Sequence, residues 1–122
     1  MRKNTTKRVG KSRSRKSAGA KLVKLPKDAV TYIVILRAKE GQALLLEAEL
    51  RALVAPTRKE EGCLQYDLHC GTDHADWFLL HEVWQTREHH TAHTRTSHFL
   101  RWNARKDALL ASRDSAFYRQ LA

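Results

Sequence analysis

The sequence predicts a single α+β domain in which a four-stranded antiparallel sheet carries its helices on one face. Three observations lead to this class. The chain has 122 residues, the usual length of one domain. Segments with strand periodicity and segments with helical periodicity follow one another in the order β-α-β-β-α-α-β. Chains with this order commonly form a split βαβ unit, whose crossover helices cover one side of the sheet.

The first half of the domain is expected to form one strand and one long helix. Residues 30–36 are rich in β-branched and aromatic side chains, which predicts a strand buried on both faces. A helix is expected over residues 42–58, closed by Gly62, because glycine tolerates the left-handed cap conformation. The apolar positions of this helix recur on one side: Leu46, Leu50, Leu53 and Val54.

Two further segments predict a pair of antiparallel strands, and the first of them alternates in polarity. In residues 63–69, Leu64, Tyr66 and Leu68 should share one face. Residues 77–84 form the returning strand after a polar, glycine-containing loop. One face of this second strand is made of Phe78, Leu80, Glu82 and Trp84.

The C-terminal part is expected to contain two short helices and a last strand. Thr86 can cap a helix that runs to about Thr94, and Ser97 can cap another over residues 98–111. Residues 116–121 are predicted to form the final strand. The apolar stripe of the second helix consists of Phe99, Trp102, Leu109 and Leu110.

The formal net charge of +10 comes from the N-terminal segment. Residues 1–27 hold 11 of the 23 Lys and Arg residues and no acidic residue, which leaves 12 basic against 13 acidic residues afterwards. We therefore divide the chain into a disordered basic tail, residues 1–27, and a nearly neutral domain, residues 28–122. The tail could make salt-dependent contacts with nucleic acid or an anionic surface.

Composition also bears on where the protein resides. No run of about 18 apolar residues occurs, so we expect no transmembrane segment, and the charged N-terminus lacks the apolar stretch of a secretory signal. Cys63 and Cys70 would lie about 23 Å apart on one strand, which is too far for a disulfide. These features favour a reducing, cytoplasmic setting.

The expected architecture leaves one face of the sheet without a covering layer. An apolar sheet face normally packs against a second layer, and an identical subunit is the simplest source of one. We therefore expect a homodimer.

Short motifs between residues 30 and 111 resemble a known family. They are Ala38-Lys39-Glu40-Gly41, residues 50–58, residues 61–68, Glu82-Val83-Trp84, Ala92-His93 and residues 96–99. In this order and spacing they resemble the antibiotic biosynthesis monooxygenase (ABM) domain family, which includes quinol monooxygenases. The resemblance implies a dimeric ferredoxin-like α+β barrel with a substrate pocket between sheet and helices. It also implies that O₂ oxygenates quinols or polycyclic phenols there without flavin, haem or metal.

Such chemistry limits which residues can act. O₂ reacts slowly with closed-shell molecules, so the protein must remove a phenolic proton and stabilise an electron-rich anion in a dry apolar pocket. The catalytic candidates are His93 as base or hydrogen-bonding partner, Trp84 as indole donor, and Glu82. Glu82 could orient His93 or bond to the backbone, because a carboxylate among apolar neighbours needs a partner.

Four further residues are candidates for substrate binding: Tyr66, His98, Trp102 and Phe78. For each candidate a purely structural role in the core or at a helix end is the alternative. The chain contains seven histidines, but it lacks Cys-x-x-Cys, His-Glu-x-x-His and facial-triad spacings, so no metal is predicted. Haem-degrading relatives of the fold use an asparagine on the first strand, which is absent here.

These considerations define one leading function and one alternative. The leading function is a cofactor-independent monooxygenase that oxidises a quinol or a polycyclic, polyketide-like phenol with O₂. The alternative is a non-catalytic dimer of the same fold that binds aromatic ligands or serves in a stress response.

Overall fold

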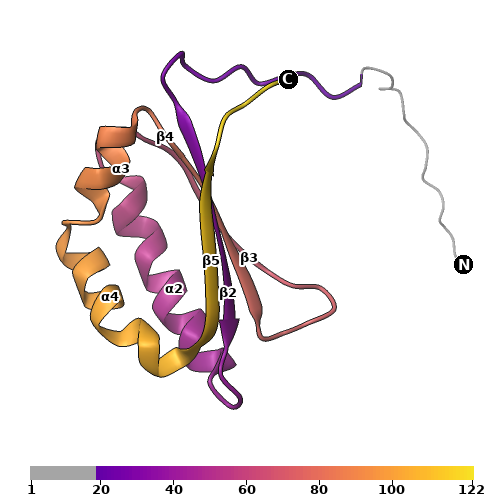
Figure 1. The fold of residues 1–122 in the computed structure, drawn as a ribbon, viewed down its shortest axis with the longest axis vertical. Helices are drawn as coiled ribbons and strands as arrows, with labels where there is room; N and C mark the ends of the chain where they lie inside the picture. Colours follow the sequence, from indigo (N-terminus) through magenta and orange to yellow (C-terminus); the bar gives the residue numbers. More distant parts are fainter. Residues whose placement is uncertain (1–18) are drawn as a thin grey trace, which may run out of the picture.

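Strand β2 (Val30–Ala38) occupies the centre of the sheet, between β4 (Trp77–Trp84) and β5 (Leu110–Tyr118). The computed structural model describes residues 19–122, and the sheet runs in the order β3-β4-β2-β5, with β3 (Cys63–Cys70) at one edge (Figure 1). All three strand pairings are antiparallel. The predicted α+β class and its ferredoxin-like arrangement of elements are confirmed.

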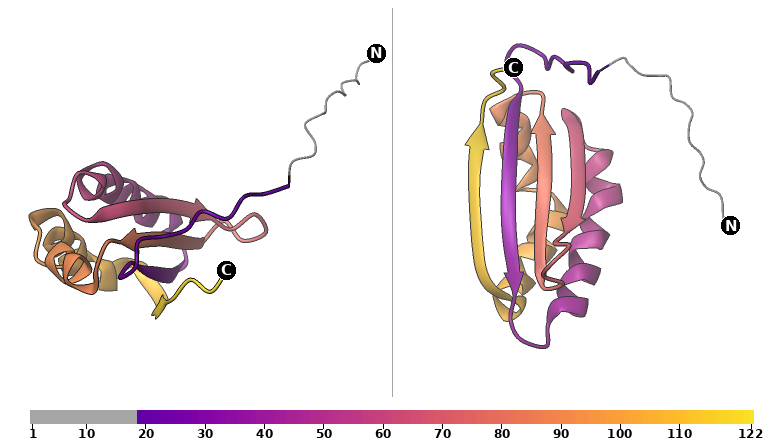
Figure 2. Two further views of the ribbon diagram at one scale, coloured as in Figure 1. Left: turned by 90° about the horizontal axis from the view of Figure 1, so that it is seen from above. Right: turned by 90° about the vertical axis from the view of Figure 1, so that its right-hand side faces the viewer.

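Helices α2 (Ala43–Arg58), α3 (Arg87–His93) and α4 (Ser97–Leu109) all lie on one face of the sheet, as Figure 2 shows. Alternate strand residues point toward them and form the core. Of the four apolar residues predicted to face the core from helix α2, the three leucines are buried and Val54 is only partly buried. The fourth buried residue of this helix is Thr57. The core includes Val34, Leu36, Leu46, Leu50, Leu53, Phe78, Leu80, Trp84 and Trp102.

The pairing of β3 with β4 corrects one expectation. Cys63 pairs with Trp84 and Gln65 with Val83, so Leu64 is an extra residue in a bulge. The bulge takes Leu64 out of the alternation and leaves its side chain 46% exposed, whereas Tyr66 is buried. Leu64 therefore does not share the core face with Tyr66, contrary to the prediction.

The last strand also differs from the prediction. Strand β5 begins at Leu110, directly after α4, and ends at Tyr118, whereas residues 116–121 were expected. Its first half is polar and has low strand propensity, but it pairs with β2 along a free edge, and this pairing outweighs the local preference. Leu110 thus belongs to the strand and not to the helix. The cap of α4 is Thr96 in place of Ser97, since its hydroxyl accepts a hydrogen bond from the N–H of Phe99.

The face of the sheet away from the helices is partly open in a single chain. Ile35 on β2 and Trp77 on β4 are each 36% exposed there. The prediction that the first strand is buried on both faces is therefore wrong for the isolated chain, because the three helices cover only the opposite side. Val83 on the same outer face is buried, beside a hollow that Val23 and Leu25 also line.

Residues 19–29 contain no helix or strand. They are tied to the C-terminus by Gln120, whose side chain accepts from the N–H of Leu25 (3.0 Å) and donates to the carbonyl of Val23 (2.7 Å). The remainder of the predicted disordered tail, residues 1–18, lies outside the described residues. Cys63 and Cys70 are free, as expected.

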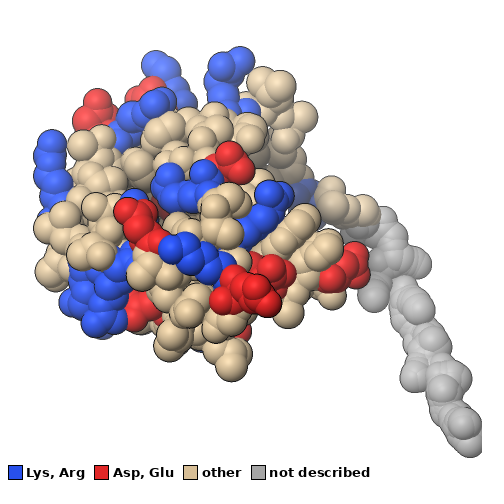
Figure 3. Space-filling model, turned by 60° about the horizontal axis from the view of Figure 1, so that its bottom comes forward, with Lys and Arg blue, Asp and Glu red and all other residues tan. Residues whose placement is uncertain are grey.

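The surface of the domain mixes charges of both signs, as the face in Figure 3 shows. On α2, Arg51 pairs with Glu47 at 2.7 Å. In residues 19–122 we find no helix with the length and apolar character needed to cross a bilayer.

Gly62 is the glycine whose replacement should cost the most stability. Its φ is +80°, and a Cβ atom there would lie 2.2 Å from Cγ of His89. We expect Gly62→Ala to lower the free energy of unfolding by roughly 2–4 kcal/mol, combining left-handed strain with the clash. Gly41→Ala is the control, since Gly41 has a φ of +78° but open space around it, and should cost about 1–2 kcal/mol. Urea denaturation measures both, and equal losses would contradict the role of the contact with His89.

Candidate active site

A small cavity of about 90 Å³ lies between the sheet and helices α3 and α4. Aliphatic side chains of β2 and β4 form its floor, and Phe99 and Trp102 of α4 form part of its wall. Six titratable side chains also line it: Tyr32, Tyr66, Glu82, His90, His93 and Arg113. A wider groove of about 460 Å³ runs outside, along α2 and β3. The buried titratable groups line the smaller cavity and not the groove, which makes the smaller cavity the candidate site.

Glu82 is the buried carboxyl group of this cavity. The pleat of β4 sends it to the core face, where β2 and β3 place Tyr32 and Tyr66 opposite it. Only 2% of the residue is exposed, and Oε1 accepts the indole N–H of Trp84 at 2.9 Å. Burial raises the pKa of Glu82 to about 7, although the indole hydrogen bond and Arg113 oppose the shift. The group can therefore gain or lose a proton near neutral pH.

His93 also lines the cavity, and its partner is a carboxylate that the sequence analysis did not single out. Its Nδ1 lies 2.7 Å from Oε2 of Glu60, in the turn after α2. Donation from Nδ1–H to this carboxylate fixes the ring so that Nε2 keeps a lone pair. Among residues 19–122 we find a hydrogen bond to Nδ1 of this ring and none to Nε2. Burial lowers the pKa of His93, while the hydrogen bond and the charge of Glu60 oppose that effect.

The expectation that Glu82 orients His93 is thus not what the structure shows. Glu82 is held by Trp84, two residues along the same strand face, and His93 is held by Glu60. Two separate carboxyl groups serve the two candidates, so that the cavity has a Trp–Glu pair on the sheet side and a His–Glu pair on the helix side.

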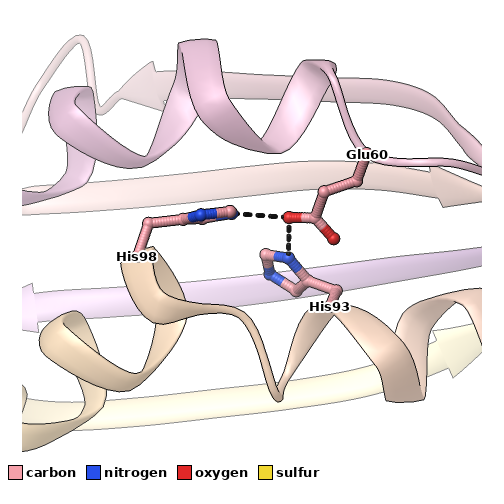
Figure 4. A group of neighbouring side chains, drawn as sticks. All are labelled: Glu60, His93 and His98. Atoms are coloured by element: carbon pink, nitrogen blue, oxygen red, sulfur yellow. Dashed lines mark hydrogen bonds and ion pairs between the residues drawn. The ribbon is translucent and has the colours of Figure 1, made fainter.

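His98 approaches the same oxygen of Glu60 from α4, with its Nε2 at 2.6 Å (Figure 4). Its Nε2 also lies 3.2 Å from the Thr96 hydroxyl. His98 is not among the residues that line the cavity, so it supports Glu60 where we had expected it to bind substrate. Phe78 is likewise displaced from its predicted role, because it is buried beside the outer groove.

Of the other predicted residues, two line the cavity, while Trp84 lies behind it. Tyr66 and Trp102 line the cavity and are 2% and 5% exposed. Burial, together with the nearby charge of Glu82, raises the pKa of the Tyr66 phenol above its usual range, so that it stays a hydrogen-bond donor. Trp84 is fully buried and reaches the cavity through Glu82.

The sequence analysis missed four residues at or beside the cavity: Glu60, Tyr32, His90 and Arg113. His90 packs against Tyr32 with ring centroids 4.4 Å apart, and burial lowers its pKa to about 4, so it is neutral at physiological pH. Arg113 lies 3.4 Å from the Tyr32 hydroxyl, which itself donates to Ser115. The i, i+3 spacing of His90 and His93 could have indicated the first. Arg113 was missed because the last strand was expected to begin only at residue 116, whereas β5 begins at Leu110.

Together the fold and the cavity define a ferredoxin-like α+β protein with a buried, titratable aromatic pocket. A sequence model of the antibiotic biosynthesis monooxygenase family matches residues 29–105, and the chain belongs to this family. The family suggested by the sequence motifs is therefore confirmed.

Several known proteins resemble the chain. Rv0793 of Mycobacterium tuberculosis, provisionally named a monooxygenase, is 35% identical over 65 residues, which span 53% of this chain and 63% of that protein. Its solved structure superposes with a TM-score of 0.74 at 27% identity, covering 78% of this chain and 97% of that one. The crystal structure of PA3566 from Pseudomonas aeruginosa gives a TM-score of 0.76 at 41% identity, covering 79% and 97%. The name of Rv0793 refers to a monooxygenase, and the two superpositions show that the fold is shared.

The raised pKa of Glu82 predicts a measurable dependence of stability on pH. A carboxyl whose pKa rises from 4.5 to about 7 on folding stabilises the fold below about pH 4.5, and this contribution is lost as pH rises through 7. Glu82→Gln removes the titration and keeps an acceptor for Trp84. We expect the variant to gain up to about 3 kcal/mol over wild type between pH 4.5 and pH 8. Urea denaturation across this range measures it, and a difference independent of pH would contradict the assignment.

Proposed function

We propose that the protein is a cofactor-independent monooxygenase that oxidises a quinol or a related phenol with O₂. The observation that carries the proposal is the buried carboxyl group of Glu82, with a pKa of about 7, in an aromatic cavity. A proton acceptor of this kind is what deprotonation of a bound phenol requires at neutral pH. Membership of the family supports the reaction class.

Each group of the cavity has a distinct role in this proposal. Glu82 takes the phenolic proton, and the resulting electron-rich anion then reacts with O₂. Trp84 is a positioning residue, because its N–H holds the Glu82 carboxylate in place. The free Nε2 of His93 accepts a hydrogen bond from a second substrate hydroxyl, as a quinol provides. Tyr66 and Arg113 donate toward the anion, and Trp102 packs against the ring.

The size of the cavity bears on the substrate. An engineered cavity of about 150 Å³ suffices for benzene, so a cavity of about 90 Å³ must widen to admit even one ring. A single-ring quinol requires less displacement of side chains than a polycyclic phenol. We therefore propose a single-ring quinol as the preferred substrate.

The proposed assembly is a homodimer formed through the outer face of the sheet. Ile35 and Trp77 expose part of their apolar surface there, beside the half-buried Ile33 and Leu79. Burial of this surface against a second copy would give the sheet its missing layer. The helix layer, and the cavity under it, would stay on the outside of such a dimer.

Replacement of the proposed base tests the activity. With metal-stripped protein and a panel of hydroquinones and anthrones, wild type should consume O₂ faster than a protein-free blank. Glu82→Gln should reduce kcat by about 100-fold or more, the usual contribution of a positioned base. The wild-type rate should rise as pH increases through about 7, because the carboxylate form is the active one, and this rise should vanish in the variant.

The exposed Glu88 on α3 supplies the control, since Glu88→Gln leaves the cavity unchanged. Oxygen uptake no faster than the blank for every substrate would contradict the enzyme. Saturable binding of aromatic compounds in that case would support the alternative, a non-catalytic ligand-binding dimer.

A charged residue on the outer face should separate the proposed dimer. Ile35→Asp places a carboxylate in the middle of the interface and should weaken association by roughly 30-fold or more, as for an interface hot spot. Leu44→Asp is the matched control, because Leu44 is 83% exposed on α2, on the helix side. Light scattering after gel filtration measures the mass, and a monomeric wild type would rule the dimer out.

A further inference from the structure

Three helices deliver a set of side chains that resembles a metal centre (Figure 4). Glu60 follows α2, His93 ends α3, and His98 lies in the first turn of α4. Each residue offers one ligand atom, and these atoms all lie within 4.8 Å of one another. We infer that Glu60, His93 and His98 form a binding site for a divalent transition-metal ion of the zinc type.

The donor set indicates which ions would bind. Two imidazole nitrogens and one carboxylate oxygen suit Zn²⁺, Co²⁺, Fe²⁺ and Cu²⁺. Ca²⁺ and Mg²⁺ prefer oxygen ligands, so two nitrogens out of three make the site a poor one for them. Three protein ligands also leave a fourth tetrahedral position for water or another small molecule.

The distances require a small adjustment on binding. Oε2 of Glu60 lies 2.7 Å from Nδ1 of His93 and 2.6 Å from Nε2 of His98, which are hydrogen-bond lengths. Ligands about 2.0–2.1 Å from a tetrahedral ion are about 3.3 Å apart. The carboxylate therefore has to withdraw by less than about 1 Å, and the two histidine nitrogens, which lie within 4.8 Å of each other, have to come to about 3.3 Å. Glu60 can do so by side-chain rotation, because it belongs to a turn outside α2.

The two histidines are held in position by the connection between their helices. The Thr96 hydroxyl donates to the carbonyl of His93 at 2.8 Å and accepts from the N–H of Phe99, which caps α4. This arrangement fixes the end of α3 relative to the start of α4 and so pre-forms half of the site. In the described part of the chain, these two histidines are the basic side chains within 4.0 Å of the Glu60 carboxylate, so neither Lys nor Arg neutralises its charge.

An ion at this site would change the face that His93 presents to the cavity. Coordination through Nδ1 moves the ring hydrogen to Nε2, so the acceptor becomes a donor. The binding site itself rests on the geometry of the cluster and not on the proposed reaction. Its test therefore needs no substrate and can fail or succeed independently of oxygen uptake.

The test titrates metal-stripped full-length protein with Co²⁺ and follows its visible absorption, with Zn²⁺ as the competitor. We expect one equivalent of Co²⁺ to bind and to be displaced by Zn²⁺. Glu60→Gln and His98→Ala should each weaken binding by roughly 100-fold, since each removes one of three ligands. Glu61→Gln is the matched control, because Glu61 is adjacent in the chain and its side chain is 93% exposed. It should bind as wild type does.

Two further measurements keep the result clear. Circular dichroism establishes that each variant is folded, so that a loss of binding is not a loss of structure. ¹⁵N NMR of the imidazole rings should show the hydrogen of His93 moving from Nδ1 to Nε2 on addition of Zn²⁺. Absence of stoichiometric Co²⁺ binding, or equal affinity in wild type and in folded Glu60→Gln and His98→Ala, would overturn the site.

Discussion

One carboxylate oxygen joins the three helices that cover the cavity. Oε2 of Glu60 receives His93 from the end of α3 and His98 from the start of α4, while Glu60 itself lies in the turn just after α2. Hydrogen bonds to an ionised acceptor are among the stronger ones in proteins. The two hydrogen bonds to Glu60 are also largely shielded from solvent. The position of the helix layer over the sheet, and hence the shape of the cavity, depends on this group.

The sheet imposes a second constraint, on Glu82. The two-residue period of β4 places Glu82 and Trp84 on the core face together with Phe78 and Leu80. Burial there destabilises the ionised form of the carboxyl group, and this raises the pKa of Glu82. The neighbouring indole offsets part of that cost through one hydrogen bond. Leucine at this position would avoid the cost, and this is one reason why we propose a chemical role for the carboxyl group.

Periodicity predicted the parts of the fold in which local pattern and tertiary environment agree. The bounds of β4 were predicted as observed, because its residues are mostly apolar and aromatic and the strand pairs with β2 without a register shift. The bulge at Leu64 was not predicted, since the position of a bulge depends on how the strand pairs with its partner. The start of β5 was missed because a polar edge strand is stabilised by its ladder with β2 and has no apolar pattern of its own.

The same distinction applies to the site. Glu82, Trp84 and His93 could be selected from their spacing along one strand and the following helix. Glu60 could not, because it lies 33 residues from His93 and follows a lysine in a turn that resembles an ordinary solvated loop. The three proposed metal ligands come from one turn and two helices, and this arrangement likewise leaves no motif in the sequence. Contacts of this kind appear only when the chain is folded.

The two nitrogens of His93 connect the proposed reaction with the proposed ion. Hydrogen-bond acceptance from a substrate by Nε2 requires the hydrogen to be on Nδ1, and the negative charge of Glu60 favours that tautomer. A metal ion on Nδ1 requires the opposite tautomer. Because one ring cannot hold both, substrate acceptance by Nε2 and ion binding exclude each other. Glu60 is common to both states, and its partner, a ring hydrogen or a metal ion, decides which form of His93 faces the cavity.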